Sequence, residues 1–321
     1  MMGQRDIDKL WGRSGRSEQR TRERGERMAR RTGLPVVTIV DVTESTNNDV
    51  MLLGREGAPH GAAVAARLAA RLREELAALE GENDDYDTLF RNGKILGTEA
   101  VFQSAWAKAF RRLLEGGSDV LCITMSSRLS GTYRSAKEAR SQLVAEGFDG
   151  ERIALLDSWT TSGGLDFLIQ RARRLIVGGA TLEETVSQLE GARARQGIVF
   201  TVPRLDVLKR SGRLGATRRA VAGKLDRYLI MTLDQGGIRD VDVAHGTTAV
   251  ARSLVKQVPE GARDGLLIVT GYGSSETTGA VVDCIRRRLP QAEVSVRDGG
   301  PVVSLHLGVG SVSLAWDVPG E

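Results

Sequence analysis

Cysteine and histidine are scarce in this chain of 321 residues, which has two of the former and three of the latter. The cysteines, Cys122 and Cys284, lie in separate apolar stretches and form no C-x-x-C pattern. The sequence therefore predicts neither a disulfide framework nor a cysteine-type zinc site. The histidines are too scattered along the chain to indicate a metal cluster. We expect a protein that holds no metal ion and no cofactor.

Long hydrophobic runs and common catalytic signatures are also missing. No apolar run approaches the roughly 18–20 residues that a membrane-spanning helix needs, and no hydrophobic stretch follows the N-terminus. These absences predict a cytoplasmic protein without an integral membrane segment. G-x-S-x-G, G-x-x-x-x-G-K-[ST] and G-x-G-x-x-G are not found, so neither a serine hydrolase nor a nucleotide-binding loop is indicated.

The formal net charge of +4 is unevenly distributed. Residues 1–33 carry ten basic and five acidic side chains, which leaves the rest of the chain one charge negative. This segment has almost no apolar residues to bury, which favours a solvated, partly helical tail. The alternative, an arm that binds nucleic acid, lacks interleaved aromatic residues, and aromatics make up only 4% of the chain. We expect no nucleic-acid partner.

Hydrophobic patterning divides the remainder into two regions. A β-branched run at 36–40 predicts a strand, and from residue 120 strands alternate with helices through short glycine-containing loops, which is typical of an α/β domain with a largely parallel sheet. A hairpin pattern and a different order of elements follow residue 203, as in an α+β domain. The expected division is a basic tail at 1–33, an α/β domain at 34–202 whose opening segment (34–84) is atypical, and an α+β domain at 203–321. The strands expected in the first domain after residue 100 are 120–125, 152–156 and 198–202.

Three polar loops lie where chemistry is expected, and each has a purely structural alternative. Residues 124–133 place hydroxyl groups at a helix N-terminus, which favours an anion, although Ser130 or Thr132 can equally cap the helix. Residues 209–215 form a basic, glycine-containing turn suited to a carboxylate or phosphate, or else a helix C-cap. Residues 299–310 set His306 among glycines that permit close approach of a ligand, although a lone histidine is more often structural.

Taken together, four motifs resemble the DegV family of bacterial fatty-acid-binding proteins. They occur in the family's order, and the segment DYDTLFRNGKILGTEA (85–100) precedes them, so that the resemblance covers about residue 84 to the C-terminus. The motifs are SSRLSGTYRSA (126–136), LLDSWTTSGG (155–164), LKRSGRLG (208–215) and LHLGVG (305–310).

The resemblance implies two α/β domains that hold one long-chain fatty acid in an apolar tunnel between them. It implies a carrier that is not itself an enzyme and presents the acyl carboxylate to a separate ATP-dependent fatty-acid kinase. By position, Thr98 and Ser130 would donate hydrogen bonds to the carboxylate, and His306 would lie beside it. Arg213 would face the head-group opening and the kinase.

Several positions depart from the family's pattern, and they keep two alternatives open. Glu99 replaces a serine beside Thr98, and an inward-pointing carboxylate there would repel the ligand. Residues 36–67 resemble the start of a biotin–protein ligase domain, but LAARLREELAALE (68–80) stands where that domain has its adenylate-binding loop. The alternatives are therefore an enzyme fragment of the biotin/lipoate-ligase type, and a degenerate DegV-like scaffold without lipid binding.

Overall fold

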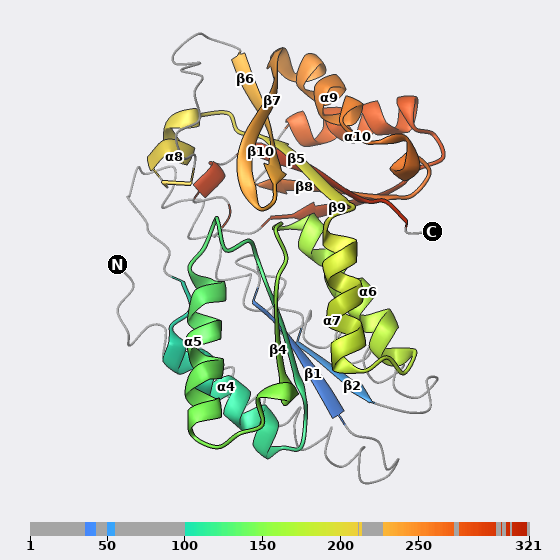
Figure 1. Cartoon of the computed structure of the whole chain (residues 1–321). Coiled ribbons are helices and arrows are strands. Elements are labelled where there is room, and N and C mark those ends of the chain that lie inside the picture. The colour runs from blue at the N-terminus through green and yellow to red at the C-terminus, as the bar shows by residue number, and fades with distance from the viewer. Residues whose placement is uncertain are drawn as a thin grey trace.

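Two β-sheets and their helices make up the fold (Figure 1). The computed structural model describes residues 36–42, 50–54, 100–210, 212–213, 227–272, 276–299, 303, 306–308 and 310–319. The predicted basic tail at 1–33 and most of the opening segment at 34–84 lie outside these residues. None of the described helices is long and apolar enough to cross a membrane.

The first unit contains a four-stranded sheet in the order β2-β1-β3-β4. The strands β1, β3 and β4 are parallel, as predicted, and β2 runs antiparallel to β1. Helices α4 and α5 pack on one face of β3, and α6 and α7 pack on the other, so every residue of β3 is buried. The elements are β1 (Val36–Val42), β2 (Val50–Gly54), α4 (Gln103–Glu115), β3 (Val120–Thr124), α5 (Thr132–Ala145), a 3-10 turn η1 (Gly150–Arg152), β4 (Ile153–Asp157), α6 (Gly163–Val177) and α7 (Leu182–Arg193).

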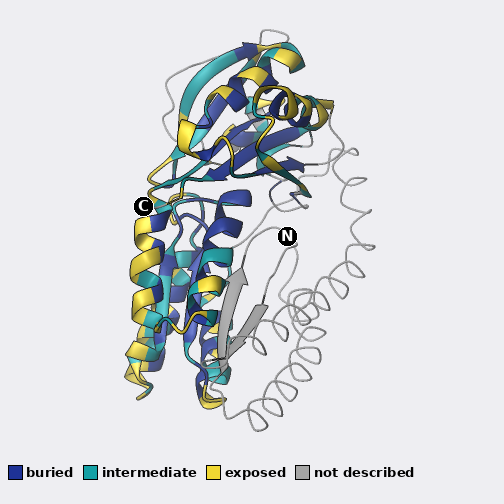
Figure 2. Ribbon diagram, turned by 90° about the vertical axis from the view of Figure 1, so that its right-hand side faces the viewer, coloured by how far each residue is buried: buried dark blue, intermediate teal, exposed yellow. Residues whose placement is uncertain are grey.

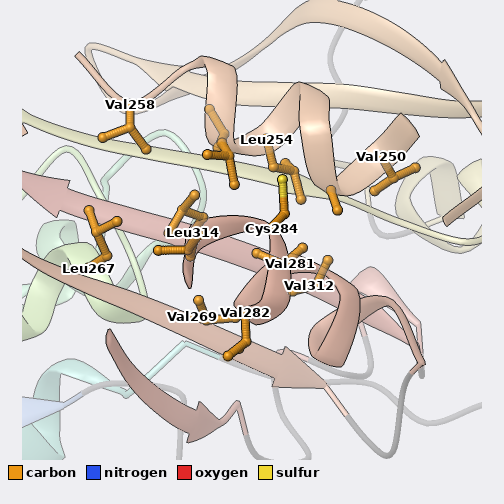
Figure 3. Close-up of a cluster of buried hydrophobic side chains, with 14 of the residues drawn as sticks. Val250, Leu254, Val258, Leu267, Val269, Val281, Val282, Cys284, Val312 and Leu314 are labelled. Carbon is orange, nitrogen blue, oxygen red and sulfur yellow. The ribbon is translucent and has the colours of Figure 1, made fainter. Parts of the chain in front are cut away.

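The second unit contains a six-stranded mixed sheet in the order β7-β6-β5-β10-β8-β9. Helices α9 and α10 cover one face of it with a valine- and leucine-rich core, in which Val250, Leu254 and Val281 pack toward Leu314 (Figure 3). The elements are β5 (Gln196–Thr201), α8 (Leu205–Arg210), β6 (Arg227–Asp234), β7 (Gly237–His245), α9 (Gly246–Lys256), a 3-10 turn η2 (Glu260–Ala262), β8 (Leu266–Tyr272), α10 (Glu276–Arg288), β9 (Glu293–Asp298) and β10 (Ser311–Asp317).

Two strands differ from the sequence-based expectation. The sequence pattern places a strand at 198–202 in the first domain, but β5 pairs antiparallel with β10 and β6 in the second sheet. A buried apolar strand has the same pattern in either sheet, so the sequence did not specify its partner. The other difference is β2, which the sequence does not indicate because VMLLG has a single β-branched residue and such a short apolar run fits a helix equally well.

The face of the six-stranded sheet that α9 and α10 leave open packs on α6 of the first unit. Phe167 of α6 shares a buried cluster with Ile198, Ile268 and Ala315 from three strands of that sheet. The approach requires glycine at position 163, because a Cβ there would lie 2.8 Å from Ile268 Cγ2. Figure 2 shows buried residues along this junction and exposed ones on the outer sides of the helices. Thus α6 belongs to the cores of both units.

Two ion pairs reinforce this contact. Arg171 of α6 bonds Asp317 of β10 over 2.6 Å, and Arg297 of β9 pairs with Asp166 of α6. The two carboxylates are 13% and 11% exposed, so water screens these pairs less than it would pairs at the surface. The pairs join α6 to two different strands of the second sheet.

Candidate functional site

A largely apolar pocket lies where the two units meet. Its empty volume is about 560 Å³, which includes the portion open to solvent. The first unit contributes loop residues that follow β3 and β4, and the second contributes strand, helix and turn residues. The lining residues are Met125, Leu129, Thr161, Ile198, Phe200, Leu208, Arg213, Leu233, Ile238, Tyr272, Val303, His306, Leu307 and Ser313.

Strand geometry explains which side chains line the pocket. Successive side chains of a strand point to opposite faces, so Ile198 and Phe200 of β5 point to the same face. Both line the pocket, whereas Val199 between them packs into the core under α9 and α10. Ser313 of β10 pairs with Phe200 in the register of the two strands and extends the same wall. The second sheet therefore has one face that forms core and another that faces the pocket.

Arg213 and His306 form a polar corner of the pocket. Arg213 Nη1 lies 3.3 Å from His306 Nδ1, and Arg213 Nε donates to the carbonyl oxygen of Leu129 over 3.1 Å. The guanidinium can only donate, so Nδ1 of His306 accepts and the proton of the neutral imidazole is on Nε2. This corner brings together the 126–136 motif, the basic turn and the 305–310 motif, three segments that the sequence singled out.

Burial and the neighbouring positive charge keep His306 neutral. Burial of the ring and then the Arg213 guanidinium lower its pKa from 6.5 to about 4. At neutral pH the corner therefore presents one permanent positive charge and one imidazole N–H donor. That combination suits an anionic group that accepts hydrogen bonds.

Ser130 lies beside this corner but is not among the pocket-lining residues. It is 9% exposed, and its Oγ lies 2.8 Å from Thr132 Oγ1 and accepts from the Thr132 backbone N–H over 3.3 Å. The hydroxyl thus stands at the N-terminus of α5, where the helix dipole favours negative charge. Thr98 and Glu99 lie outside the described residues.

A buried chain of hydroxyl groups is the main feature that sequence reasoning missed. Tyr272 Oη lies 2.7 Å from Ser162 Oγ and 3.3 Å from Ser313 Oγ, which connects the start of α6 to β8 and β10. Burial raises the pKa of the Tyr272 phenol, so the group stays protonated and able to donate. Of the residues in this chain of hydroxyl groups, the sequence motifs include only Ser162, which belongs to the 155–164 motif. Tyr272 could not be singled out, because a tyrosine at the end of a strand is not distinctive. Among the residues that the structure describes, no cluster of His, Cys, Asp and Glu side chains could hold a metal ion.

A comparison of the sequence with models of known protein families identifies the family to which this fold belongs. The family model described as "Uncharacterised protein, DegV family" matches residues 74–318, which include both sheets after β2 and every described pocket residue. The chain belongs to the DegV family. The predicted fold class is thereby confirmed as a two-domain DegV fold, with a parallel-stranded sheet in one unit and a larger mixed sheet in the other.

Relatives and solved structures agree with this assignment. A DegV domain-containing protein from Mycobacterium bovis is 30% identical over 234 residues, 71% of this chain and 80% of its own length. A structure described as "Fatty Acid Binding of a DegV family Protein from Thermus thermophilus" superimposes with a TM-score of 0.65 at 25% identity, covering 74% of this chain and 84% of that one.

The fold is shared with a further solved structure, whose description names a fatty acid kinase. The Streptococcus pneumoniae Fatty Acid Kinase (Fak) B3 protein, loaded with linoleic acid, superimposes with a TM-score of 0.64 at 20% identity. The match covers 74% of this chain and 83% of that one, which shows that the two folds are alike.

Proposed function

We propose that this chain binds a long-chain fatty acid in the pocket between its two units. The observation that carries the proposal is the pairing of an almost wholly apolar wall with the Arg213–His306 corner. Each methylene of an acyl chain gains about 0.8 kcal/mol on leaving water, so such a wall supplies most of the affinity. The Thermus thermophilus relative of the same fold, described as fatty-acid-binding, supports this reading.

The carboxylate would bind at the polar corner. A carboxylate that leaves water needs hydrogen-bond donors, because an unpaired buried charge is costly. Arg213 would supply a charge-assisted donor, and His306 would supply its Nε2–H. Where Thr132 donates to Ser130, the Ser130 hydroxyl keeps its own proton for the ligand. Thr98 would be a further donor, as the family resemblance implies.

The proposed role is that of a carrier and not of an enzyme. The chain would hold the acyl group and expose its carboxylate to a separate ATP-dependent kinase, with Arg213 facing the opening. The pneumococcal protein of this fold, which belongs to a fatty acid kinase system by its description, is the support for this partner.

The direct test is native mass spectrometry of the purified full-length chain. We expect a mass increment that matches one fatty acid, which solvent extraction removes and added palmitate or oleate restores. A chain that carries no lipid and takes up neither acid would refute the proposal and favour the degenerate scaffold. Formation of biotinyl-adenylate from biotin and ATP would instead favour the ligase alternative.

Presentation to a kinase needs its own assay. Loaded protein, ATP and the catalytic subunit of a fatty-acid kinase are expected to yield acyl phosphate, and an extracted, lipid-free sample is the control. Lipid uptake without any acyl phosphate would leave the chain a fatty-acid-binding protein and rule out the kinase role.

A further inference from the structure

The tip of the β6–β7 hairpin extends beyond the sheet to which it belongs. In the register between β6 and β5, the last pair toward the tip joins Thr232 to Val199, whereas β6 and β7 remain paired as far as Asp234 and Gly237. A register shift at Ile230/Met231 interrupts the hairpin on the other side. We call residues 233–238 the arm. Two strands without further partners are marginally stable by themselves, so the arm depends on the packing of Leu233 and Ile238 and on what its tip touches.

The tip of the arm rests on the loop that follows β3 in the first unit. Ser126 Oγ donates to the carbonyl oxygen of Gly236 over 2.8 Å. Arg128 Nη1 lies 3.5 Å from the carbonyl oxygen of Asp234. Gln235 and Gly236 have φ values of 45° and 81°, the left-handed geometry of a tight hairpin turn. A Cβ on Gly236 would lie 2.2 Å from Ser126 Oγ, so only glycine allows this approach.

The segments that form this contact also form walls of the pocket. Leu233 and Ile238 of the arm line it, and so do Met125 and Leu129, which flank the loop residues that touch the tip. Lifting the tip from the loop would therefore move these walls of the pocket away from each other. In Figure 1 the hairpin turn reaches down toward the loops above α5.

The two sides of the junction are held very differently. On the α6 side, Phe167 packs into a shared core and two ion pairs bridge the units. On the arm side, the polar contacts of the tip are hydrogen bonds to two backbone carbonyl groups. Opening at the arm would break these hydrogen bonds and the packing of Leu233 and Ile238, which are only partly buried, whereas opening at α6 would break a fully buried core and two ion pairs.

We propose that Ser126 and the arm form a clasp that must open for the ligand to enter or leave the pocket. Ser126 is a positioning residue here, since it holds the arm closed and does not line the pocket. The inference rests on the proposed function, because a clasp needs a ligand to admit. It predicts that the clasp sets the rate of ligand exchange and has little effect on the affinity.

A reversible cross-link tests the clasp. A Cβ on Gly236 would lie 3.1 Å from Ser126 Cβ, which is shorter than the mean disulfide spacing of about 3.8 Å. The positive φ of Gly236 adds backbone strain, so oxidation of Ser126→Cys/Gly236→Cys joins the two segments only if the turn shifts. The native cysteines are both buried. Stopped-flow fluorescence with cis-parinaric acid, on extracted full-length protein, measures entry of the probe. We expect entry to slow by at least about tenfold when oxidised and to recover on reduction.

A single substitution avoids the strain of that variant. Ser126→Ala removes the donor to Gly236, and we expect the association and dissociation rate constants both to rise by about three- to tenfold. Their ratio, the affinity, should stay within about twofold. Ser127→Ala is the matched control, because it removes a neighbouring exposed hydroxyl and should leave both rates unchanged.

The outcomes separate the clasp from the function on which it rests. If the native chain binds the probe but the oxidised variant exchanges it as fast as the reduced one, the clasp is refuted and the function stands. A loss of affinity in Ser126→Ala through dissociation alone would make Ser126 a ligand contact and would also refute the clasp. A native chain that does not bind the probe would refute both.

Discussion

Replacing His306 with glutamine is expected to change how stability depends on pH. In the unfolded chain a histidine binds a proton below about pH 6.5. In the folded protein, burial and Arg213 lower the pKa of His306 to about 4. Between these values the unfolded state binds more protons, so the free energy of unfolding falls as the pH drops from 6.5 through 4. Glutamine keeps an acceptor for Arg213 and cannot titrate.

The size of the effect follows from the two pKa values. The full difference corresponds to about 3 kcal/mol, and roughly half of that once solvent screening of the partly exposed ring is allowed for. Above pH 6.5 the contribution to stability is fully present. The native chain should therefore lose about 1–3 kcal/mol more than His306→Gln between pH 7.5 and pH 4, since other titrating groups act alike in both proteins.

Urea unfolding followed by circular dichroism at several pH values measures this difference. His245→Gln, which replaces an exposed histidine at the end of β7, is the control and should follow the native chain. If the native chain and His306→Gln lose the same stability on acidification, then His306 is not held neutral by the pocket. The argument for an imidazole N–H donor in the polar corner would then fail.

Three further substitutions test the site and the junction. Ser130→Ala should weaken fatty-acid binding by roughly 1–3 kcal/mol in calorimetry, the cost of an unpaired buried group, and unchanged affinity would remove Ser130 from the site. Ile198→Trp should fill the pocket and abolish lipid uptake while circular dichroism stays native, whereas undiminished uptake would place the ligand elsewhere. Gly163→Ala should lower stability by about 1–3 kcal/mol through its clash with Ile268. Its control is Gly191→Ala on α7, where the nearest atom is 3.9 Å away and which should be neutral or stabilising by up to about 1 kcal/mol.

Local patterning was sufficient to predict most elements of the fold. The strand predicted at 120–125 contains β3, whose run VLCI is apolar because helices cover both faces of the strand. The sheet to which β5 belongs could not be predicted in the same way. Partner choice depends on contacts with β10, which lies more than a hundred residues away, and local sequence carries no information about such a contact.

The candidate site was predicted through motifs and not through geometry. The three loops indicated Arg213 and His306, and the structure brings these two together with Leu129. The walls were not predicted, because Ile198 and Phe200 look like any core residues until the face of β5 that they occupy is known. The link between Tyr272 and Ser162 joins residues 110 positions apart and left no pattern in the sequence.

The position of β5 has a consequence for dividing the chain into fragments. Because β5 lies between β6 and β10, a cut after Val202 would remove an inner strand from the second sheet and leave two unpaired edges. The severed strand would stay attached to the first fragment as an apolar edge, a template for aggregation. A fragment of the second unit intended to fold alone should therefore begin before Gln196. It would still expose the surface that α6 covers in the whole chain.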